Sequence, residues 1–318
     1  MSYKVVIPQD ITDAGKEYLV ENGYELVIGD GKIDAENLKK IVADADALLV
    51  RSACCDMEII DAAKKLKVIG NHGVGVDNID IDYCTKKGIW VTNAPLSNTI
   101  SVAEHTMGLL FALAHNFVFM DSETRKGNWE IRNSLKGDDL AGKTLGLVGL
   151  GRIGSLVAKK AALGADMKVI GYDPFISTDA FPEGVMPVKT VEEVFEQADY
   201  VSVHVPSLPE TRGMINLNLF SRMKKSAAFI NCSRGDVVNE EDLFKALSEG
   251  MIRTAGIDVF VGEPAGKENP LFALDNIIVT PHSAAMTQES MDRMGLHAAM
   301  GIHDVLSGNK PQWAVNIL

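Results

Sequence analysis

Short apolar runs alternate with helix-like segments along most of the chain, in two series. The runs of the first series are Lys4–Ile7, Glu25–Ile28, Ala47–Val50, Lys67–Ile69 and Trp90–Val91, with helical patterns such as Asp10–Asn22, Asp34–Ala43 and Glu58–Lys65 between them. The runs of the second series are Thr144–Val148, Lys168–Gly171, Tyr200–Val205, Ala227–Asn231, Ala255–Val259 and Asn276–Thr280. Strands that alternate with helices build parallel sheets covered on both faces. The pattern therefore predicts an α/β fold with two doubly wound parallel-sheet domains.

A long segment, Ile100–Lys126, lies between the two series. Its apolar residues recur at helical spacing and it contains no proline, so we expect an extended helix. Gln288–Leu306, beyond the last run of the second series, has the same helical pattern and is expected to cross back to the first domain. The first domain is therefore predicted to be discontinuous, with residues 1–99 and 288–318, and the second to contain residues 100–287.

The bulk composition excludes some partners. The 318 residues include 31 Lys and Arg against 43 Asp and Glu, a formal net charge of −12. A nucleic-acid partner is not expected, because phosphate binding needs a basic face. The N-terminus has too little apolar character for a signal peptide and is expected to form the first strand. The longest apolar stretch, Met107–Met120, is interrupted by His115 and Asn116 and is too short to span a bilayer, so no membrane partner is expected.

The cysteines carry no metal signal. Cys54, Cys55, Cys84 and Cys232 show no metal-binding spacing, and two of them are adjacent. Thiols of this kind are most simply interpreted as packing residues in a reducing compartment. The sequence therefore predicts a cytoplasmic protein without a metal site.

A glycine turn between an apolar run and a helical stretch carries the first chemical signal. Gly149, Gly151 and Gly154, with Arg152 and Ile153 between them, have the spacing of a dinucleotide-binding turn. The first glycine permits the tight turn, the second lets backbone N–H groups approach a pyrophosphate, and the third lets helix and strand pack closely. The N-terminus of the helix then faces the phosphate charge.

Asp173 closes the next apolar run, where a carboxylate would accept hydrogen bonds from the hydroxyls of an adenosine ribose. The residues that follow it, Pro174-Phe175-Ile176, include no cation to neutralise a 2′-phosphate. Together with the flanking strands, this predicts a nucleotide site that prefers NAD to NADP.

Three charged residues, Arg234, Glu263 and His282, each follow a predicted strand of the second series. Taken alone, Arg234 could be a solvated turn residue, Glu263 could be part of a surface turn, and His282 could cap the helix that follows it. On one sheet with a nicotinamide nucleotide, they form a set that can oxidise an alcohol next to a carboxylate. An imidazole can move the proton because its pKa lies near neutrality, and a nearby carboxylate would raise that pKa and orient the ring. A guanidinium can grip the substrate carboxylate through two hydrogen bonds.

Several separated segments carry motifs that occur together in this order in one protein family. These segments are His72–Asp80, Ser101–Glu104, Leu140–Thr144 leading into the glycine turn, Asn231–Gly235, Asp258–Pro264 and Thr280–Ala284. Over nearly its whole length, the chain resembles the D-isomer-specific 2-hydroxyacid dehydrogenase family. The resemblance implies a Rossmann NAD-binding domain and a discontinuous, flavodoxin-like substrate-binding domain.

The resemblance also implies roles for single residues. It makes His282 the acid/base, Glu263 its partner and Arg234 the substrate anchor. The N–H groups of Val74 and Gly75 would bind the substrate carboxylate. Besides the glycine turn, Arg152, Ile153 and Asp173, the implied cofactor contacts are Pro206, Thr211, Cys232, Asp258, Ser283 and Ala284. The D stereochemistry of the substrate follows from the resemblance alone.

Within the family the chain is most similar to phosphoglycerate dehydrogenases. Val50-Arg51-Ser52-Ala53 resembles their substrate-loop motif, so Arg51 and Ser52 are candidates for substrate binding, with Arg51 placed for a second anionic group. A surface ion pair is the alternative for Arg51. Asn71 stands where many of these enzymes carry a basic residue, which weakens the case for a phosphate site. Because the chain ends at Leu318, we do not expect the C-terminal regulatory domain that many of them bear.

Together with the residues above, the resemblance implies an NAD-dependent D-2-hydroxyacid dehydrogenase that acts on 3-phosphoglycerate. Reduction of hydroxypyruvate or glyoxylate is the alternative with the same chemistry. An NADH-responsive binding protein, as in the corepressor branch of the family, is the alternative of a different class. Residues 101–126 could form a buried core helix or a dimer helix. Their apolar side chains lie around most of the helix circumference, which with the resemblance predicts a homodimer built on this region.

Overall fold

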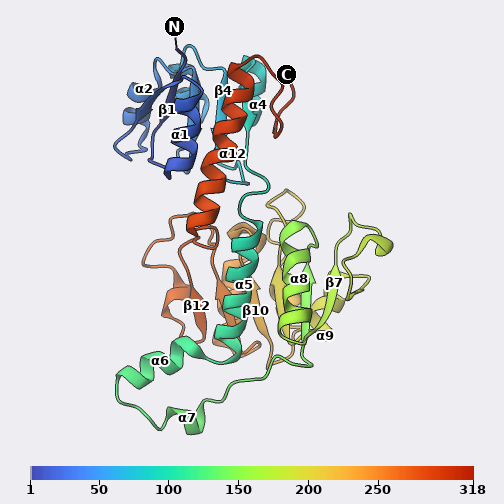
Figure 1. Ribbon diagram of the computed structural model, residues 1–318. Helices are drawn as coiled ribbons and strands as arrows, with labels where there is room; N and C mark the ends of the chain where they lie inside the picture. The colour runs from blue at the N-terminus through green and yellow to red at the C-terminus, as the bar shows by residue number, and fades with distance from the viewer. Residues whose placement is uncertain (1) are drawn as a thin grey trace. The chain divides into compact units, whose positions relative to one another are not determined.

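The computed structural model describes residues 2–318 and divides them into two compact units. The first unit contains residues 2–98 and 286–318, and the second contains residues 99–285 (Figure 1). Each unit is built around one parallel sheet with helices packed on it. The prediction of an α/β fold with two parallel-sheet domains is therefore confirmed.

The first unit has five strands and five helices. They are β1 (Lys4–Ile7), α1 (Asp13–Glu21), β2 (Glu25–Ile28), α2 (Ala35–Val42), β3 (Ala47–Val50), α3 (Met57–Ala62), β4 (Val68–Asn71), α4 (Ile81–Lys87), β5 (Trp90–Thr92) and α12 (Gln288–Leu306). The strand order is β2-β1-β3-β4-β5 and every pair is parallel, which is the flavodoxin-like arrangement. The central strands β3 and β4 are buried along their whole length because helices cover both faces.

Helix α12 completes the first unit although the whole second unit separates it from β5 in the chain. It packs on α1 and β4, and glycines allow the close approach (Figure 1). A Cβ on Gly15 would lie 2.6 Å from the carbonyl oxygen of Gly295, and a Cβ on Gly70 would lie 2.8 Å from that of Ala298. Larger residues at these positions would force the helix away from the sheet.

The second unit has seven strands. Its elements are α5 (Thr99–Ala114), α6 (Phe117–Arg125), α7 (Ile131–Ser134), β6 (Thr144–Val148), α8 (Arg152–Gly164), β7 (Lys168–Tyr172), η1 (Thr178–Ala180), β8 (Val185–Pro187), α9 (Val191–Gln197), β9 (Tyr200–Val203), α10 (Leu217–Phe220), β10 (Ala228–Asn231), η2 (Gly235–Val237), α11 (Glu240–Ser248), β11 (Thr254–Ile257), η3 (Pro270–Ala273) and β12 (Ile277–Val279). The strand order is β12-β11-β10-β9-β6-β7-β8, again all parallel. This is the Rossmann strand order with one further strand. The chain adds strands on one side of β6 up to β8 and then on its other side, beginning with β9.

One predicted element differs from the structure. The segment 100–126 does not form one extended helix, because the helical path ends at Asn116, whose φ is 55°. Asparagine tolerates this left-handed conformation better than most residues, and its side-chain Nδ2 donates to the carbonyl of Lys136 at 3.0 Å. The N–H of Asp138 donates to the carbonyl of Ala114 at 2.8 Å, so the two ends of residues 115–137 are held together.

We call residues 115–137 the arm. Its helices α6 and α7 bury none of their residues, and in Figure 1 they extend away from the sheet of their own unit. The apolar pattern also did not predict β8, a three-residue edge strand that contains Pro187. Among residues 2–318, no helix has both the length and the apolar character needed to cross a membrane.

Candidate active site

Three glycines in the turn between β6 and α8 do different things. Gly149 has a φ of 91°, and a Cβ there would lie 2.5 Å from the carbonyl oxygen of His204. A Cβ on Gly154 would lie 2.1 Å from the carbonyl oxygen of Gly149, so the first turn of α8 packs directly on the turn. A Cβ on Gly151 would meet no atom within 4 Å, which leaves its backbone open to approach. This combination fits a pyrophosphate bound at the helix N-terminus.

Asp173 follows β7 and its carboxylate is partly engaged. Oδ2 accepts from the N–H of Leu150 at 2.9 Å, which ties the glycine turn to the end of β7. Oδ1 accepts from the N–H of Phe175, also at 2.9 Å. Since each carboxylate oxygen can accept a second hydrogen bond, Asp173 keeps acceptor capacity for ribose hydroxyls. The residues present therefore fit a dinucleotide without a 2′-phosphate.

The other predicted cofactor contacts lie near carboxyl ends of strands in the same sheet. Arg152 and Ile153 open α8, with Arg152 exposed. After β9, the hydroxyl of Thr211 donates to the carbonyl of Pro206 at 2.6 Å and so closes that loop on itself. Cys232 follows β10 and is buried, and burial raises the pKa of its thiol to about 12. The thiol is therefore neutral, and its contact with a cofactor stays a prediction.

The second unit brings the three predicted catalytic residues to one edge of its sheet. Arg234 follows β10, Glu263 follows β11 and His282 follows β12, and these strands are neighbours and parallel. His282 Nδ1 lies 2.5 Å from Glu263 Oε2. The glycine turn follows β6 of the same parallel sheet and so lies at the same edge. The structure thus places an imidazole–carboxylate pair and a guanidinium on the sheet that carries the nucleotide turn.

The electrostatics of the pair favour a charged imidazole. The hydrogen bond to Glu263 raises the pKa of His282, against the opposing effects of burial and of the nearby Arg234 guanidinium. Burial alone would raise the pKa of Glu263, but hydrogen bonds from His282 and from the N–H of Phe260 (2.8 Å) lower it below its ordinary value. An anionic Glu263 beside His282 holds the ring with Nδ1 inward, so Nε2 is the nitrogen left for a substrate.

A buried amide shapes the turn that carries Arg234. Asn231, at the end of β10, donates from Nδ2 to the carbonyl of Arg234 at 2.9 Å, and its Oδ1 accepts from the N–H and the hydroxyl of Ser233 at 2.9 and 2.7 Å. A Cβ on Gly235 would lie 2.0 Å from the carbonyl carbon of Phe260, so this turn packs against the loop that leads to Glu263. Asn231 was not predicted to have a role, although it is a polar residue at the end of a buried strand and begins the segment Asn231–Gly235.

Asp258 was predicted to line the cofactor groove, and the structure gives its carboxylate another use. The side chain is fully buried and accepts hydrogen bonds from the N–H groups of Ser283 and Ala284 at 2.8 and 2.9 Å. Ser283 and Ala284, also predicted as cofactor contacts, are thereby fixed in the loop around His282. Contact between these three residues and a cofactor stays a prediction.

In the first unit, the carbonyl groups of Gly73–Gly75, the loop after β4, are all engaged. The carbonyl of Gly73 accepts from the N–H of Ala94 at 2.8 Å. The carbonyl of Val74 accepts from Nδ2 of Asn93 at 2.7 Å, and that of Gly75 accepts from Nδ2 of Asn71 at 2.7 Å. Asn71 therefore holds the loop. From the sequence it was noted only because many phosphoglycerate dehydrogenases carry a basic residue at this position. A dedicated hydrogen bond to each carbonyl fixes the orientation of the peptide groups.

The same loop leaves its N–H groups available. Within residues 2–318, no acceptor contacts the N–H of Val74 or Gly75. Consecutive free N–H groups can donate together to one anion. This geometry suits the predicted binding of a carboxylate by Val74 and Gly75.

Arg51 and Ser52 follow β3 of the same sheet. The Nη1 group of Arg51 donates to the carbonyl of Asp10 at 3.1 Å, and in the described part of the chain Arg51 forms no ion pair. The alternative of a surface ion pair is therefore not what the structure shows. Both the N–H and the hydroxyl of Ser52 lie 3.1 Å from Oε1 of Gln9, a residue that the sequence analysis did not single out.

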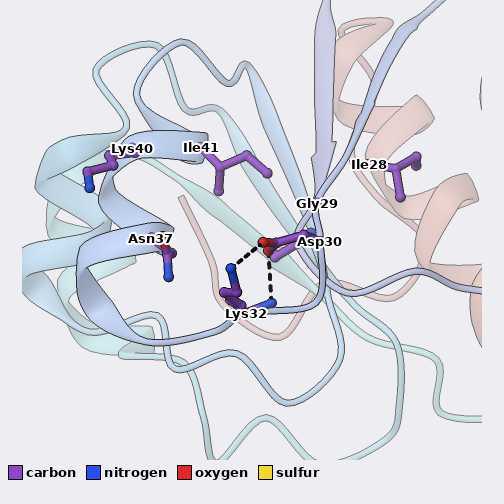
Figure 2. A pocket seen from close by; sticks show the side chains of 8 residues that line it. Ile28, Gly29, Asp30, Lys32, Asn37, Lys40 and Ile41 are labelled. Carbon is purple, nitrogen blue, oxygen red and sulfur yellow. Dashed lines mark hydrogen bonds and ion pairs between the residues drawn. The ribbon is translucent and has the colours of Figure 1, made fainter.

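A cavity of about 360 Å³ in the first unit lies apart from these residues, next to β2 and α2 (Figure 2). Both of its lysines are paired, Lys32 with Asp30 at 3.1 Å and Lys40 with Glu36 at 2.7 Å. It offers no unpaired cation to a ligand. No cluster of His, Cys, Asp and Glu that could hold a metal ion occurs within residues 2–318.

Comparison with known proteins covers nearly the whole chain. A family model described as D-isomer specific 2-hydroxyacid dehydrogenase, NAD binding domain, matches residues 107–284. The D-3-phosphoglycerate dehydrogenase of Methanocaldococcus jannaschii is 44% identical over 317 residues, which make up 99% of this chain and 59% of that protein. The chain thus spans about three-fifths of the length of the first curated relatives that it matches.

Two solved structures show the same fold. The TT0316 protein from Thermus thermophilus has a TM-score of 0.90 and 35% identity, covering 98% of this chain and 100% of that one. An NAD⁺-bound 3-phosphoglycerate dehydrogenase from Entamoeba histolytica has a TM-score of 0.84 and 32% identity, covering 100% of both chains. The similarity therefore extends over the elements of both units.

Proposed function

The chain belongs to the D-isomer specific 2-hydroxyacid dehydrogenase family, and from this premise we propose that it transfers hydride between NAD and C2 of 3-phosphoglycerate or its 2-keto form. The observation that carries the proposal is the pairing of His282 Nδ1 with Glu263 Oε2 at 2.5 Å, on the sheet that also carries Arg234 and the glycine turn. An acid/base with a raised pKa beside a fixed cation is what oxidation of a hydroxy acid requires.

Bound NAD supplies the hydride acceptor at its nicotinamide ring. In oxidation, His282 takes the proton of the C2 hydroxyl on Nε2, and in reduction it returns that proton. Glu263 stabilises the imidazolium and keeps its ring oriented, because its carboxylate is anionic and hydrogen-bonded to Nδ1. Arg234 binds the substrate carboxylate and polarises the C2 oxygen.

We assign the other substrate contacts to the first unit. We assign the free N–H groups of Val74 and Gly75 to the substrate carboxylate. Arg51, which has no ion-pair partner of its own within residues 2–318, binds the phosphate, and Ser52 supports that loop through Gln9. The cofactor contacts proposed from the sequence remain as assigned, with the glycine turn and Asp173 as the main ones.

Reduction of hydroxypyruvate or glyoxylate is the second candidate, and Asn71 favours it. Its Nδ2 is committed to the carbonyl of Gly75, so Asn71 does not serve as a phosphate ligand, and Arg51 is the single cation assigned to that group. The two candidates differ in whether a phosphate on the substrate contributes binding energy.

A panel of 2-keto acids separates these candidates. With NADH and 3-phosphohydroxypyruvate, hydroxypyruvate, glyoxylate or pyruvate, we expect the phosphorylated acid to have a kcat/KM at least about tenfold above that of hydroxypyruvate, which corresponds to about 1.4 kcal/mol. Equal values for the two would establish the second candidate. Binding of NADH without turnover of any keto acid would instead favour an NADH-responsive binding protein.

The nucleotide turn has its own test in Gly154→Ala. A Cβ there would lie 2.1 Å from the Gly149 carbonyl, so the turn must shift and NADH affinity should fall at least about tenfold. Gly164→Ala is the matched control, because Gly164 ends the same helix and a Cβ there would meet no atom within 4 Å. Fluorescence titration with NADH measures both, and equal affinities would place the cofactor elsewhere.

We further propose that the chain is a homodimer through residues 101–126, which contain most of α5 and all of α6. Helices α6 and α7 have nine and four residues and bury none of them, and helices this short are not stable in water without packing. Trp129 and Phe117 are 63% and 56% exposed, and Phe117 stacks on His115 with ring centroids 5.3 Å apart. Sedimentation equilibrium should give about twice the mass of one chain.

We also propose a cytoplasmic location. All four cysteines are free, and Cys55, Cys84 and Cys232 are buried. Burial raises the pKa of each of these three thiols to about 12. Unreactive, unpaired thiols suit a reducing compartment.

A further inference from the structure

One buried carboxylate holds the loop that carries His282. Asp258 follows β11 and has no exposed surface. Its Oδ1 accepts from the N–H of Ser283 at 2.8 Å and from the hydroxyl of Thr280 at 2.5 Å, and its Oδ2 accepts from the N–H of Ala284 at 2.9 Å. A buried carboxylate is tolerated only where its oxygens are hydrogen-bonded. The stability of this charge and the shape of the loop therefore depend on each other.

The backbone of His282 needs this support. Its φ of 50° lies in the left-handed region, which is unfavourable for a non-glycine residue. Its N–H donates to the carbonyls of Asp258 at 2.8 Å and Thr280 at 3.0 Å, which hold the residue in that conformation. If these contacts were released, the backbone would return to an ordinary conformation and the imidazole would move off Glu263.

A second histidine joins this network from another element. His105 lies in α5, which packs on β10 and β11, and its Nε2 is 3.1 Å from Thr280 Oγ1 and 3.6 Å from Asp258 Oδ1. The Thr280 hydroxyl has one proton, and at 2.5 Å that proton goes to the Asp258 carboxylate. Thr280 Oγ1 must then accept from His105, so Nε2 of His105 carries a proton. The hydrogen bonds run in one direction, from His105 through Thr280 to Asp258.

We propose that His105 and Thr280 are positioning residues for catalysis, which fix the His282 loop through the Asp258 carboxylate and so set the distance between His282 and Glu263. The proposal rests on the proposed function, in which His282 moves the C2 proton. Neither residue needs to touch the substrate. Their effect comes from keeping a strained backbone in place, and a displacement of about 1 Å in a catalytic group is enough to lower a rate up to a hundredfold.

In each pair of variants, one removes a hydrogen-bonding group of the network and the other keeps one. Thr280→Val removes the hydroxyl, whereas Thr280→Ser keeps it. His105→Leu removes the donor, whereas His105→Gln can place an amide N–H near the position of Nε2. Thr254→Val is the matched control, because Thr254 begins β11 at the opposite end of the same sheet and its hydroxyl donates to the carbonyl of Asn276 at 2.9 Å.

Three measurements on the full chain are compared. They are kcat and KM for keto-acid reduction, the unfolding temperature, and the NMR titration of the His282 imidazole. For Thr280→Val and His105→Leu we expect kcat to fall about tenfold with little change in KM. We also expect the pKa of His282 to move down toward its ordinary value, because the hydrogen bond to Glu263, the main cause of its elevation, loosens. Thr280→Ser and His105→Gln should recover most of both properties.

A purely structural role would give a different result. It would lower the unfolding temperature of Thr280→Val as much as that of Thr254→Val and leave the His282 titration unchanged, which would overturn the proposal. If the wild-type chain reduced no keto acid, the proposed function would fail, but the His282 titration would still report whether the network holds the loop. The two failures are therefore distinguishable.

Discussion

Replacing His282 with alanine is expected to lower kcat for keto-acid reduction by about a thousandfold, the usual scale for loss of a general acid. NADH affinity should stay unchanged, because the cofactor is held mainly by the glycine turn and Asp173, which the substitution leaves intact. The variant also removes Glu263's hydrogen-bond partner, so the pKa of that carboxyl should rise. Steady-state kinetics and NADH titration on the same preparation provide the comparison.

His303→Ala is the control for this experiment. His303 belongs to α12 in the first unit, where its Nδ1 lies 2.9 Å from the hydroxyl of Tyr24, and we assign it no part in the chemistry. It should retain the wild-type rate. A His282→Ala variant with comparable turnover would mean that another group supplies the proton, and the assignment of the site would be wrong.

Replacing Arg234 with leucine is expected to lower kcat/KM about a hundredfold or more, since loss of one member of a hydrogen-bonded charge pair costs about 2–5 kcal/mol. The variant should also change the pH profile in a defined direction. Reduction needs a protonated His282, so the rate falls as the pH rises through its pKa. Arg234 lowers that pKa, and its removal should move the fall to higher pH.

Glu263→Gln provides the opposite shift. The hydrogen bond to Glu263 is the main cause of the raised pKa of His282, so its weakening should move the fall in rate to lower pH. Profiles of kcat/KM measured for both variants should therefore move apart on either side of the wild type. Two profiles that shift in the same direction would contradict the proposed arrangement of the three side chains.

The sheets could be predicted from the sequence because nearly all of their strands are continuous apolar runs. The exception is β8, which has three residues, includes Pro187 and lies at the edge of its sheet, where a proline costs no ladder hydrogen bond inside the sheet. The break at Asn116 was also missed, because the hydrogen bond that holds its side chain goes to the carbonyl of Lys136, twenty residues further along the chain. Apolar periodicity contains no information about such a contact.

The residues expected to do the chemistry could be found because each follows a strand and carries a reactive side chain. The residues that hold these reactive side chains in place could not be found from the sequence. Asn231 shapes the Arg234 turn, Asn71 holds the Gly75 carbonyl, and Thr280 donates to Asp258. Their side chains are common polar groups, and their roles depend on which partners the fold brings near them.

The discontinuity of the first unit has a consequence for its synthesis. Apolar residues of β1 and β4, such as Ile7 and Val68, are buried in one cluster with Ala298 and Ile302 of α12. A ribosome must add all of residues 99–285 before it reaches that helix, which at 5–20 residues per second takes on the order of ten to forty seconds. During translation the amino-terminal part waits with this surface uncovered, so we expect the second unit to fold first.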